Sequence, residues 1–139
     1  MDGLSFEEYL EKNGTLTYRN RGVSMLPMLR QDRDLFTVAR KTPARCKKYD
    51  VVLYRRPPRS YVLHRIVAVR ERDYVILGDN CVNYEYGVTD DDILGVMTSF
   101  VHKGRTVLAT DFGYRVYVRL WCATAGLRIF LKKCRSRLR

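Results

Sequence analysis

The fold of this chain is constrained most by a series of short β-rich runs, which follow one another without helices between them. Val, Ile, Tyr and Phe dominate these runs, and Pro-Pro, Gly-Asp-Asn and Lys-Gly turn signals separate several of them. The runs cover residues 34–40, 50–56, 60–70, 73–79, 93–102 and 105–110. Strands at this spacing are typical of barrels and sandwiches. The sequence therefore predicts a mainly β, barrel-like domain over residues 15–112.

A short helix is predicted ahead of this domain, within residues 1–14. Ser5 and Glu8 form an S-x-x-E capping box, and apolar residues recur at helical spacing until Gly14. With 139 residues, the chain has the length of one domain with short additions.

The sequence predicts a basic amphipathic helix over residues 113–139. No acidic residue follows Asp111, whereas Arg and Lys continue to Arg139. The apolar positions that share one helical face are Val116, Leu120, Ala123, Leu127, Phe130 and Leu131. Such a helix either lies on an anionic membrane surface, with Trp121 as an interfacial anchor, or packs its apolar face on the β domain.

The charge balance indicates an anionic partner. Lys and Arg number 26 against 15 Asp and Glu, which gives a net charge of +11. Aromatic residues are not interleaved with the basic ones, and no nucleic-acid-binding motif is visible, so nucleic acid is the less favoured partner. No apolar run is long enough for a transmembrane helix or resembles the core of a secretory signal. We therefore expect a peripheral membrane-associated or a cytoplasmic protein.

The 4 cysteines are scattered, without a C-x-x-C pair or a histidine cluster. This pattern predicts neither a metal site nor a disulfide framework, and no motif calls for a cofactor.

Ser24 is the candidate nucleophile, because its hydroxyl stands in an apolar, proline-stiffened segment, "GVSMLPML". A serine hydroxyl needs a base within hydrogen-bond reach before it can attack a carbonyl. The chain has 2 histidines. His102 lies beside a predicted Lys-Gly turn, where a solvated imidazole is expected, and His64 lies inside an apolar run. A histidine in a strand is by itself more often structural than catalytic.

Five segments in order extend the pattern: "GVSMLPML", "DVVLY", "LHRIVAV", "ILGDN" and "ILGVM". This series, from about residue 22 to 101, resembles the type I signal peptidase family, whose fold is shared with LexA-type self-cleaving repressors. Bacterial-type members place a lysine base just before an arginine. Here His64 precedes Arg65, which resembles the endoplasmic-reticulum and archaeal branch. The resemblance implies a serine endopeptidase that cleaves signal- or leader-type peptides, with Ser24 as nucleophile and His64 as general base.

The resemblance also implies a supporting acid in or shortly after the Gly-Asp-Asn segment. Asp79 matches that position, and Glu85 is the alternative. Asp79 could equally belong to a turn, and the acidic residues 90–92 to a solvated loop. A histidine base would make the rate rise with pH through an apparent pKa near 6.5.

Gly22, Met25, Leu26 and Pro27 are the candidate substrate-binding residues. The apolar side chains around Ser24, including Met28, either line shallow pockets for a peptide that adds to a sheet edge or pack in the core. Many relatives carry a hydroxyl at the position of Gly22. The Ser24 amide is then the natural oxyanion donor, and Gly22 could instead allow a positive φ angle.

Two other functions stay open. A LexA-like domain could serve as a catalytically degenerate binding or dimerisation module, although such a module needs no base at His64. The charge alone would also suit a nucleic-acid-binding basic β domain. Most signal peptidases have a transmembrane anchor, so the basic helix would replace it by docking on an anionic leaflet, or the enzyme would be a soluble leader peptidase.

Overall fold

The structure, a computed structural model, describes residues 3–138; residues 1–2 and 139, which fall in the two predicted terminal helices, lie outside it. The elements are α1 (Phe6–Asn13), β1 (Thr15–Arg19), β2 (Leu35–Arg40), β3 (Val51–Arg56), β4 (Ser60–Val69), β5 (Tyr74–Leu77), β6 (Glu85–Val88), the 3-10 turn η1 (Asp90–Asp92), β7 (Ile93–His102), β8 (Arg105–Leu108), α2 (Phe112–Ala123) and α3 (Ala125–Arg137). The prediction of a mainly β chain is confirmed, and each of the predicted runs contains a strand.

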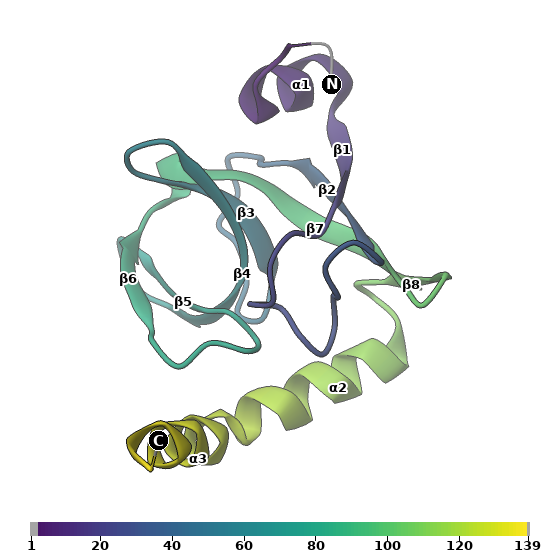
Figure 1. The fold of residues 1–139 in the computed structure, drawn as a ribbon. Coiled ribbons are helices and arrows are strands. Elements are labelled where there is room, and N and C mark those ends of the chain that lie inside the picture. Colours follow the sequence, from purple (N-terminus) through teal and green to yellow (C-terminus); the bar gives the residue numbers. More distant parts are fainter. Residues whose placement is uncertain (1–2, 139) are drawn as a thin grey trace.

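The strands form one open, antiparallel sheet of 8 strands. Their order is β1-β2-β7-β3-β4-β5-β6, and β8 pairs with β7. Figure 1 shows β3 to β6 curling into a ring. The Tyr54 hydroxyl of β3 donates a hydrogen bond of 2.6 Å to Glu85 at the start of β6, which ties the two ends of this curl together.

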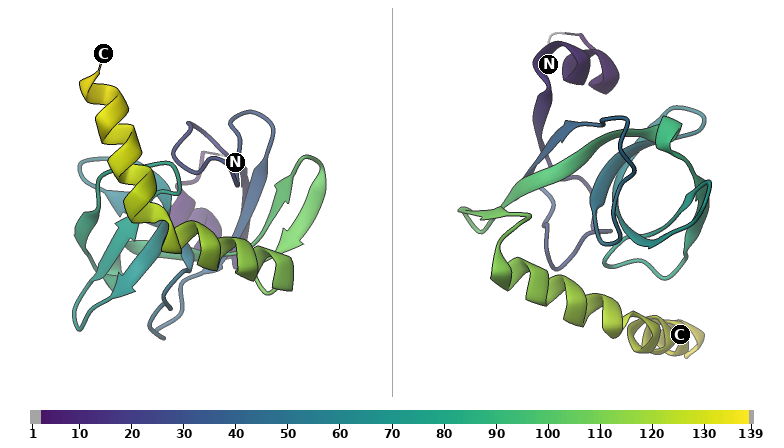
Figure 2. Two further views of the ribbon diagram at one scale, coloured as in Figure 1. Left: turned by 90° about the horizontal axis from the view of Figure 1, so that it is seen from below. Right: turned by 180° about the vertical axis from the view of Figure 1, so that it is seen from behind.

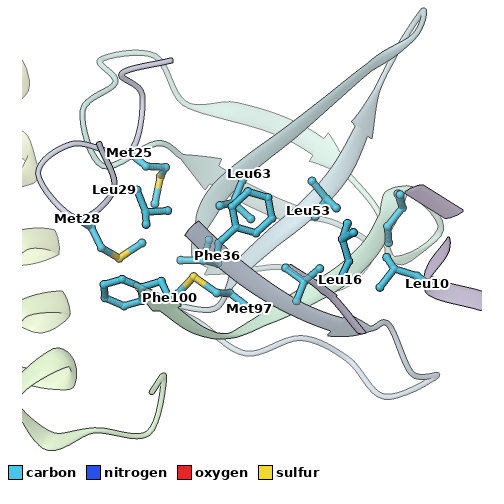
Figure 3. Close-up of a cluster of buried hydrophobic side chains, with 13 residues drawn as sticks. Leu10, Leu16, Met25, Met28, Leu29, Phe36, Leu53, Leu63, Met97 and Phe100 are labelled. Atoms are coloured by element: carbon cyan, nitrogen blue, oxygen red, sulfur yellow. The ribbon is translucent and has the colours of Figure 1, made fainter. Parts of the chain in front are cut away.

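Strand β3 is buried on both faces, and its alternating side chains enter two apolar clusters. Val51 and Leu53 belong to the larger cluster, while Val52 and Tyr54 belong to the smaller one. In Figure 3 the larger cluster runs from Met25 at one end to Leu10 at the other. The segment that carries Ser24 is therefore packed on the core of the sheet.

Helix α1 begins and ends as the sequence predicts. The Ser5 side chain accepts a hydrogen bond from the Glu8 amide, and Gly14 closes the helix with a φ angle of 78°. Leu10 is buried in the larger cluster.

The C-terminal segment forms two helices, so the prediction of one continuous helix is wrong. The break lies at Thr124, whose hydroxyl donates to the Leu120 and Trp121 carbonyls at 3.0 and 3.1 Å. Such side-chain bonds to the preceding turn compete with the helical pattern and favour a bend. Figure 2 shows the change of direction between α2 and α3. Neither these helices nor α1, within residues 3–138, has the length and apolar content that a bilayer crossing requires.

Helix α2 packs on the β domain through a face different from the one that its apolar pattern marks. Tyr114, Tyr117 and Trp121 face the sheet. The expectation that Trp121 anchors in a membrane interface is wrong, because its indole N–H donates to the Asp79 carbonyl at 2.8 Å. Aromatic side chains with a polar end suit this interface, since buried polar groups of the sheet need partners there.

Candidate active site

Ser24 lies in an irregular turn after β1 that the β5–β6 connection holds in place. The Asn80 amide donates to the Ser24 carbonyl at 2.8 Å, and the Asn80 side chain donates to the Val23 carbonyl at 3.0 Å. On the other side, the Gly22 amide donates to the Gln31 side chain at 2.9 Å. The backbone that presents Ser24 is thus bound on both sides of the residue.

Ser24 and His64 line the same cavity, which has a volume of about 980 Å³. Their segments meet at Gly78. A Cβ atom on this glycine would lie 2.9 Å from the Ser24 carbonyl oxygen and 3.0 Å from Cδ2 of the His64 ring. A side chain at position 78 would therefore push the two apart.

No hydrogen bond joins the Ser24 and His64 side chains in the described part of the chain. The imidazole Nδ1 instead lies 3.4 Å from the Tyr54 hydroxyl. Hydrogen bonds between catalytic groups are commonly long before substrate binds and tighten in the complex. The geometry brings the two residues to one cavity without a direct hydrogen bond between them.

Tyr54 links the imidazole to Glu85. Its hydroxyl donates to Glu85 Oε1 at 2.6 Å, so its oxygen acts as an acceptor toward His64 Nδ1. This arrangement assigns the ring proton to Nδ1 and leaves the lone pair on Nε2. Arg56 donates to both Glu85 and the Tyr54 hydroxyl, at 2.7 and 3.3 Å. Glu85 thus contacts the imidazole indirectly, through the Tyr54 hydroxyl, a link that the sequence did not reveal.

Burial lowers the pKa of His64 to about 4, and the positive charge of Arg56 acts in the same direction. The negative charges of Glu85 and Asp79 oppose this shift. The expected value near 6.5 is therefore too high. An imidazole with this pKa is neutral at pH 7 and can accept a proton, although its driving force as a base is smaller than that of an unperturbed histidine.

Glu85 is ionised beside this imidazole. Burial raises the pKa of its carboxyl group, but the hydrogen bonds from Arg56 and Tyr54 outweigh burial and leave this pKa below its usual value. An anionic Glu85 favours the imidazolium that forms when His64 takes a proton.

Asp79 occupies a different place from the one expected of an acid that supports the base directly. Its carboxylate accepts hydrogen bonds from Arg65 Nε and Nη2 at 2.8 and 3.0 Å, and from the Tyr117 hydroxyl at 2.9 Å. Arg65 and Asp79 are 1% and 3% exposed. His64 and Arg65 are consecutive in β4, so their side chains point to opposite faces of the strand. Asp79 thus pairs with the residue that follows the histidine, on the other face.

The apolar residues around Ser24 lie mostly in the core. Met25 and Met28 are 1% and 4% exposed and belong to the larger cluster, so the expectation that they line substrate pockets is wrong. The cause is a helical turn in which the Leu29 amide donates to the Met25 carbonyl, which directs these side chains inward. Leu26 is half-buried and Pro27 is exposed, yet neither lines the cavity of Ser24 and His64.

Gly22 adopts a φ angle of 77°, so this position favours glycine for its backbone. Within residues 3–138, the Ser24 amide donates to no protein acceptor. That amide is therefore the candidate donor to an oxyanion.

The remaining polar residues of the sequence analysis are structural. His102 lies beside the turn at residues 103–104 and is partly exposed, as expected, but its Nδ1 also lies 2.8 Å from the Met28 carbonyl oxygen. Residues 90–92 form η1 and not a loop, and Asp90 is tied to Lys41 and Tyr74.

Tyr54, Arg56 and Lys132 are the residues near the site that sequence reasoning missed. Lys132 of α3 donates to the Asn80 carbonyl at 2.8 Å and also contacts the Asn80 side-chain oxygen. Glu85 lies 31 and 29 residues from Tyr54 and Arg56, and Asn80 lies 52 residues from Lys132, so no local pattern could have marked these contacts.

Comparison of the sequence with models of protein families gives no match. The curated proteins and the solved structures give none either.

Proposed function

We propose that this chain is a serine endopeptidase of the Ser-His type that cleaves signal- or leader-type peptides. The observation that supports it is the shared cavity of Ser24 and His64, two residues from distant segments that meet at Gly78. The class of substrate comes from the resemblance to signal peptidases.

In this mechanism His64 Nε2 takes the proton of the Ser24 hydroxyl as its oxygen attacks the peptide carbonyl carbon. The Ser24 amide donates to the resulting oxyanion. The imidazolium, hydrogen-bonded through Nδ1 to Tyr54 and near the charge of Glu85, then protonates the leaving amine. Water attacks the acyl-enzyme with His64 again as base, which releases the second product and restores Ser24.

The substrate would bind in extended form along β1. This strand pairs only with β2 among the described strands, and its residues Tyr18 and Arg19 line the cavity. A peptide that adds to such an edge gains main-chain hydrogen bonds and places alternate side chains toward the cavity.

Substitution of the two reacting residues tests the proposal. With a synthetic peptide that carries a signal-type cleavage site, Ser24→Ala and His64→Ala should each lower kcat by about a thousandfold or more, because the removed group takes part in the bond-making step. Ser60→Ala, at an exposed position on β4, is the matched control and should leave kcat unchanged. Circular dichroism melting curves should show that the variants fold.

Full cleavage by folded Ser24→Ala would overturn the peptidase assignment. Binding of the same peptide by the wild-type chain without any cleavage would instead indicate the catalytically degenerate binding module.

A further inference from the structure

An apolar stripe runs along the outward side of α2 and α3. Phe112, Leu120 and Leu127 are 81%, 64% and 62% exposed. The stripe consists of Phe112, Val116, Leu120, Leu127, Phe130 and Leu131. Consecutive members are mostly three or four residues apart within each helix, so they share one face. Monomeric soluble proteins rarely leave such a contiguous apolar surface in water.

The stripe faces outward because the opposite side of the helices is already bound. On α2, Tyr117 donates to the Asp79 carboxylate, and Trp121 donates to the Asp79 carbonyl. On α3, Lys132 donates to the Asn80 carbonyl. Turning the helices to bury the stripe would break these bonds and leave the Asp79 carboxylate short of a partner in the interior.

The two helices follow one another end to end, with a bend at Thr124, and the β domain lies on the same side of both. In Figure 1 they run below the strands, and the view from below in Figure 2 shows both helices in front of the sheet. Each helix therefore turns its outer side away from the β domain.

Basic residues flank the stripe. Arg115 and Arg119 directly precede Val116 and Leu120, so each lies about 100° around the helix from a stripe residue. On α3, Lys133 and Arg137 come three and seven residues after Phe130, and Arg135 comes four residues after Leu131, so they lie beside the stripe. No acidic residue follows Asp111. Among residues 3–138, none of the ion pairs uses a side chain of α2 or α3. These cations thus have no carboxylate partner, although the Arg119 guanidinium lies 5.3 Å from the centroid of the Tyr49 ring.

We propose that the outer face of α2 and α3 docks on an anionic lipid bilayer. The apolar stripe would enter the boundary between headgroups and acyl chains, and the flanking cations would contact lipid phosphates. A second copy of the same face is a poor occupant, because cations of like sign would meet across the interface. Nucleic acid would leave the apolar stripe uncovered. The proposal does not depend on peptidase activity.

Co-sedimentation with vesicles tests this proposal on the full chain. The wild-type protein should bind vesicles of phosphatidylcholine and phosphatidylglycerol, mixed at about three to one, at least tenfold more tightly than phosphatidylcholine alone. The binding should weaken as salt is added. Leu127→Gln combined with Phe130→Gln should lower the affinity about tenfold or more, since both side chains would lose their place in the apolar layer.

Two matched controls separate the face from general effects. Val69→Gln changes an exposed apolar residue on β4 and should not alter vesicle binding. Lys133→Gln with Arg135→Gln should weaken binding to anionic vesicles, whereas Arg59→Gln with Arg72→Gln removes two exposed cations elsewhere and should have a much smaller effect.

Equal binding to both vesicle types, no binding at low salt, or unchanged binding by the folded Leu127→Gln, Phe130→Gln variant would each overturn the proposal. A dimer in sedimentation without vesicles that this same variant abolishes would also overturn it, because a second copy would then cover the stripe.

Discussion

At the scale of single residues, the environment of His64 determines its chemistry. The side chain is buried in a strand beside Arg56, and both effects favour the neutral ring. Tyr54 and Glu85 act in the opposite sense, by accepting the Nδ1 proton and by placing a negative charge nearby. Two opposed effects thus act on the pKa of His64: burial favours the neutral ring, and the negative charge of Glu85 favours the protonated ring.

The low pKa of His64 predicts a dependence of stability on pH. In the unfolded chain the ring titrates near 6.5, and in the folded chain near 4. Between these values the unfolded state binds a proton that the folded state does not, so stability is full above pH 6.5 and falls as the pH is lowered toward 4. The loss from this group should be about 3 kcal/mol. Urea unfolding of the wild-type and His64→Asn chains at several pH values measures the difference.

Wild-type and His64→Asn curves that run parallel from neutral to acidic pH would contradict the prediction. An imidazole that titrates near 6.5 in an NMR experiment on the folded protein would do so as well.

The sequence pointed to the two residues of the proposed reaction but not to what surrounds them. Ser24 and His64 could be marked because their neighbours form a recognisable series of segments. Tyr54 could not, since a tyrosine in a β-rich run is ordinary and its partner Glu85 comes from another strand. Asp79 matched the expected sequence position of the supporting acid, yet its carboxylate forms an ion pair with the Arg65 guanidinium.

At the scale of elements, the Arg65–Asp79 ion pair joins β4, the β5–β6 connection and α2. Burial alone would lower the pKa of Arg65, but the hydrogen bonds and charge of Asp79 raise it, so the pair is ionised in the interior. Arg65 also donates to the Tyr114 hydroxyl at 3.0 Å, and Tyr117 donates to Asp79 at 2.9 Å. The bond network satisfies charges that would otherwise be costly to bury.

Removal of Asp79 should therefore act on stability. Asp79→Asn leaves the buried guanidinium without its counter-charge and should lower the free energy of unfolding by roughly 3–5 kcal/mol. Glu11→Gln, which breaks an exposed pair with Arg40, is the control and should change it by less than about 1 kcal/mol. Denaturant unfolding monitored by circular dichroism measures both. An Asp79→Asn chain as stable as wild type, but inactive, would make Asp79 a catalytic group.

The runs predicted as strands were found because β-branched and aromatic residues alternate over their length. Strands β1 and β6 were missed, since "TLTYR" and "EYGV" are short and weakly apolar, and their pairing comes from the neighbouring strands. The orientation of α2 was also beyond the sequence. Its apolar face is turned away from the β domain because Arg65 and Asp79 lie on the side that α2 covers. These two residues form hydrogen bonds with the tyrosine and tryptophan side chains of α2.

At the scale of the whole molecule, α2 completes the β domain whereas α3 is an outer addition. Tyr114 and Tyr117 of α2 pack against the larger core cluster, and Val118 is buried. Most side chains of α3 are exposed, and Ala125 is its buried residue among those described.

Truncation should separate these roles. A chain that ends at Thr124 should keep a cooperative unfolding transition close to that of the full chain, but lose most of its binding to anionic vesicles. A chain that ends at Asp111 should lose several kcal/mol, on the order of the cost of exposing a buried ion pair and its partners. Thermal unfolding together with vesicle co-sedimentation measures both effects. Equal stability of the two truncated chains would contradict this division.

The adjacency of His64 and Arg65 has a consequence for the pairing of β4. A slip of this strand by one residue would turn the guanidinium into the cavity and the neutral ring toward the Asp79 carboxylate. Both changes are unfavourable. The first removes the proposed base from the cavity, and the second leaves the buried Asp79 carboxylate without its counter-charge. The pairing of β4 that places Arg65 and Asp79 against α2 is thus the same pairing that places the imidazole in the cavity of Ser24, so a shift in register would disrupt both.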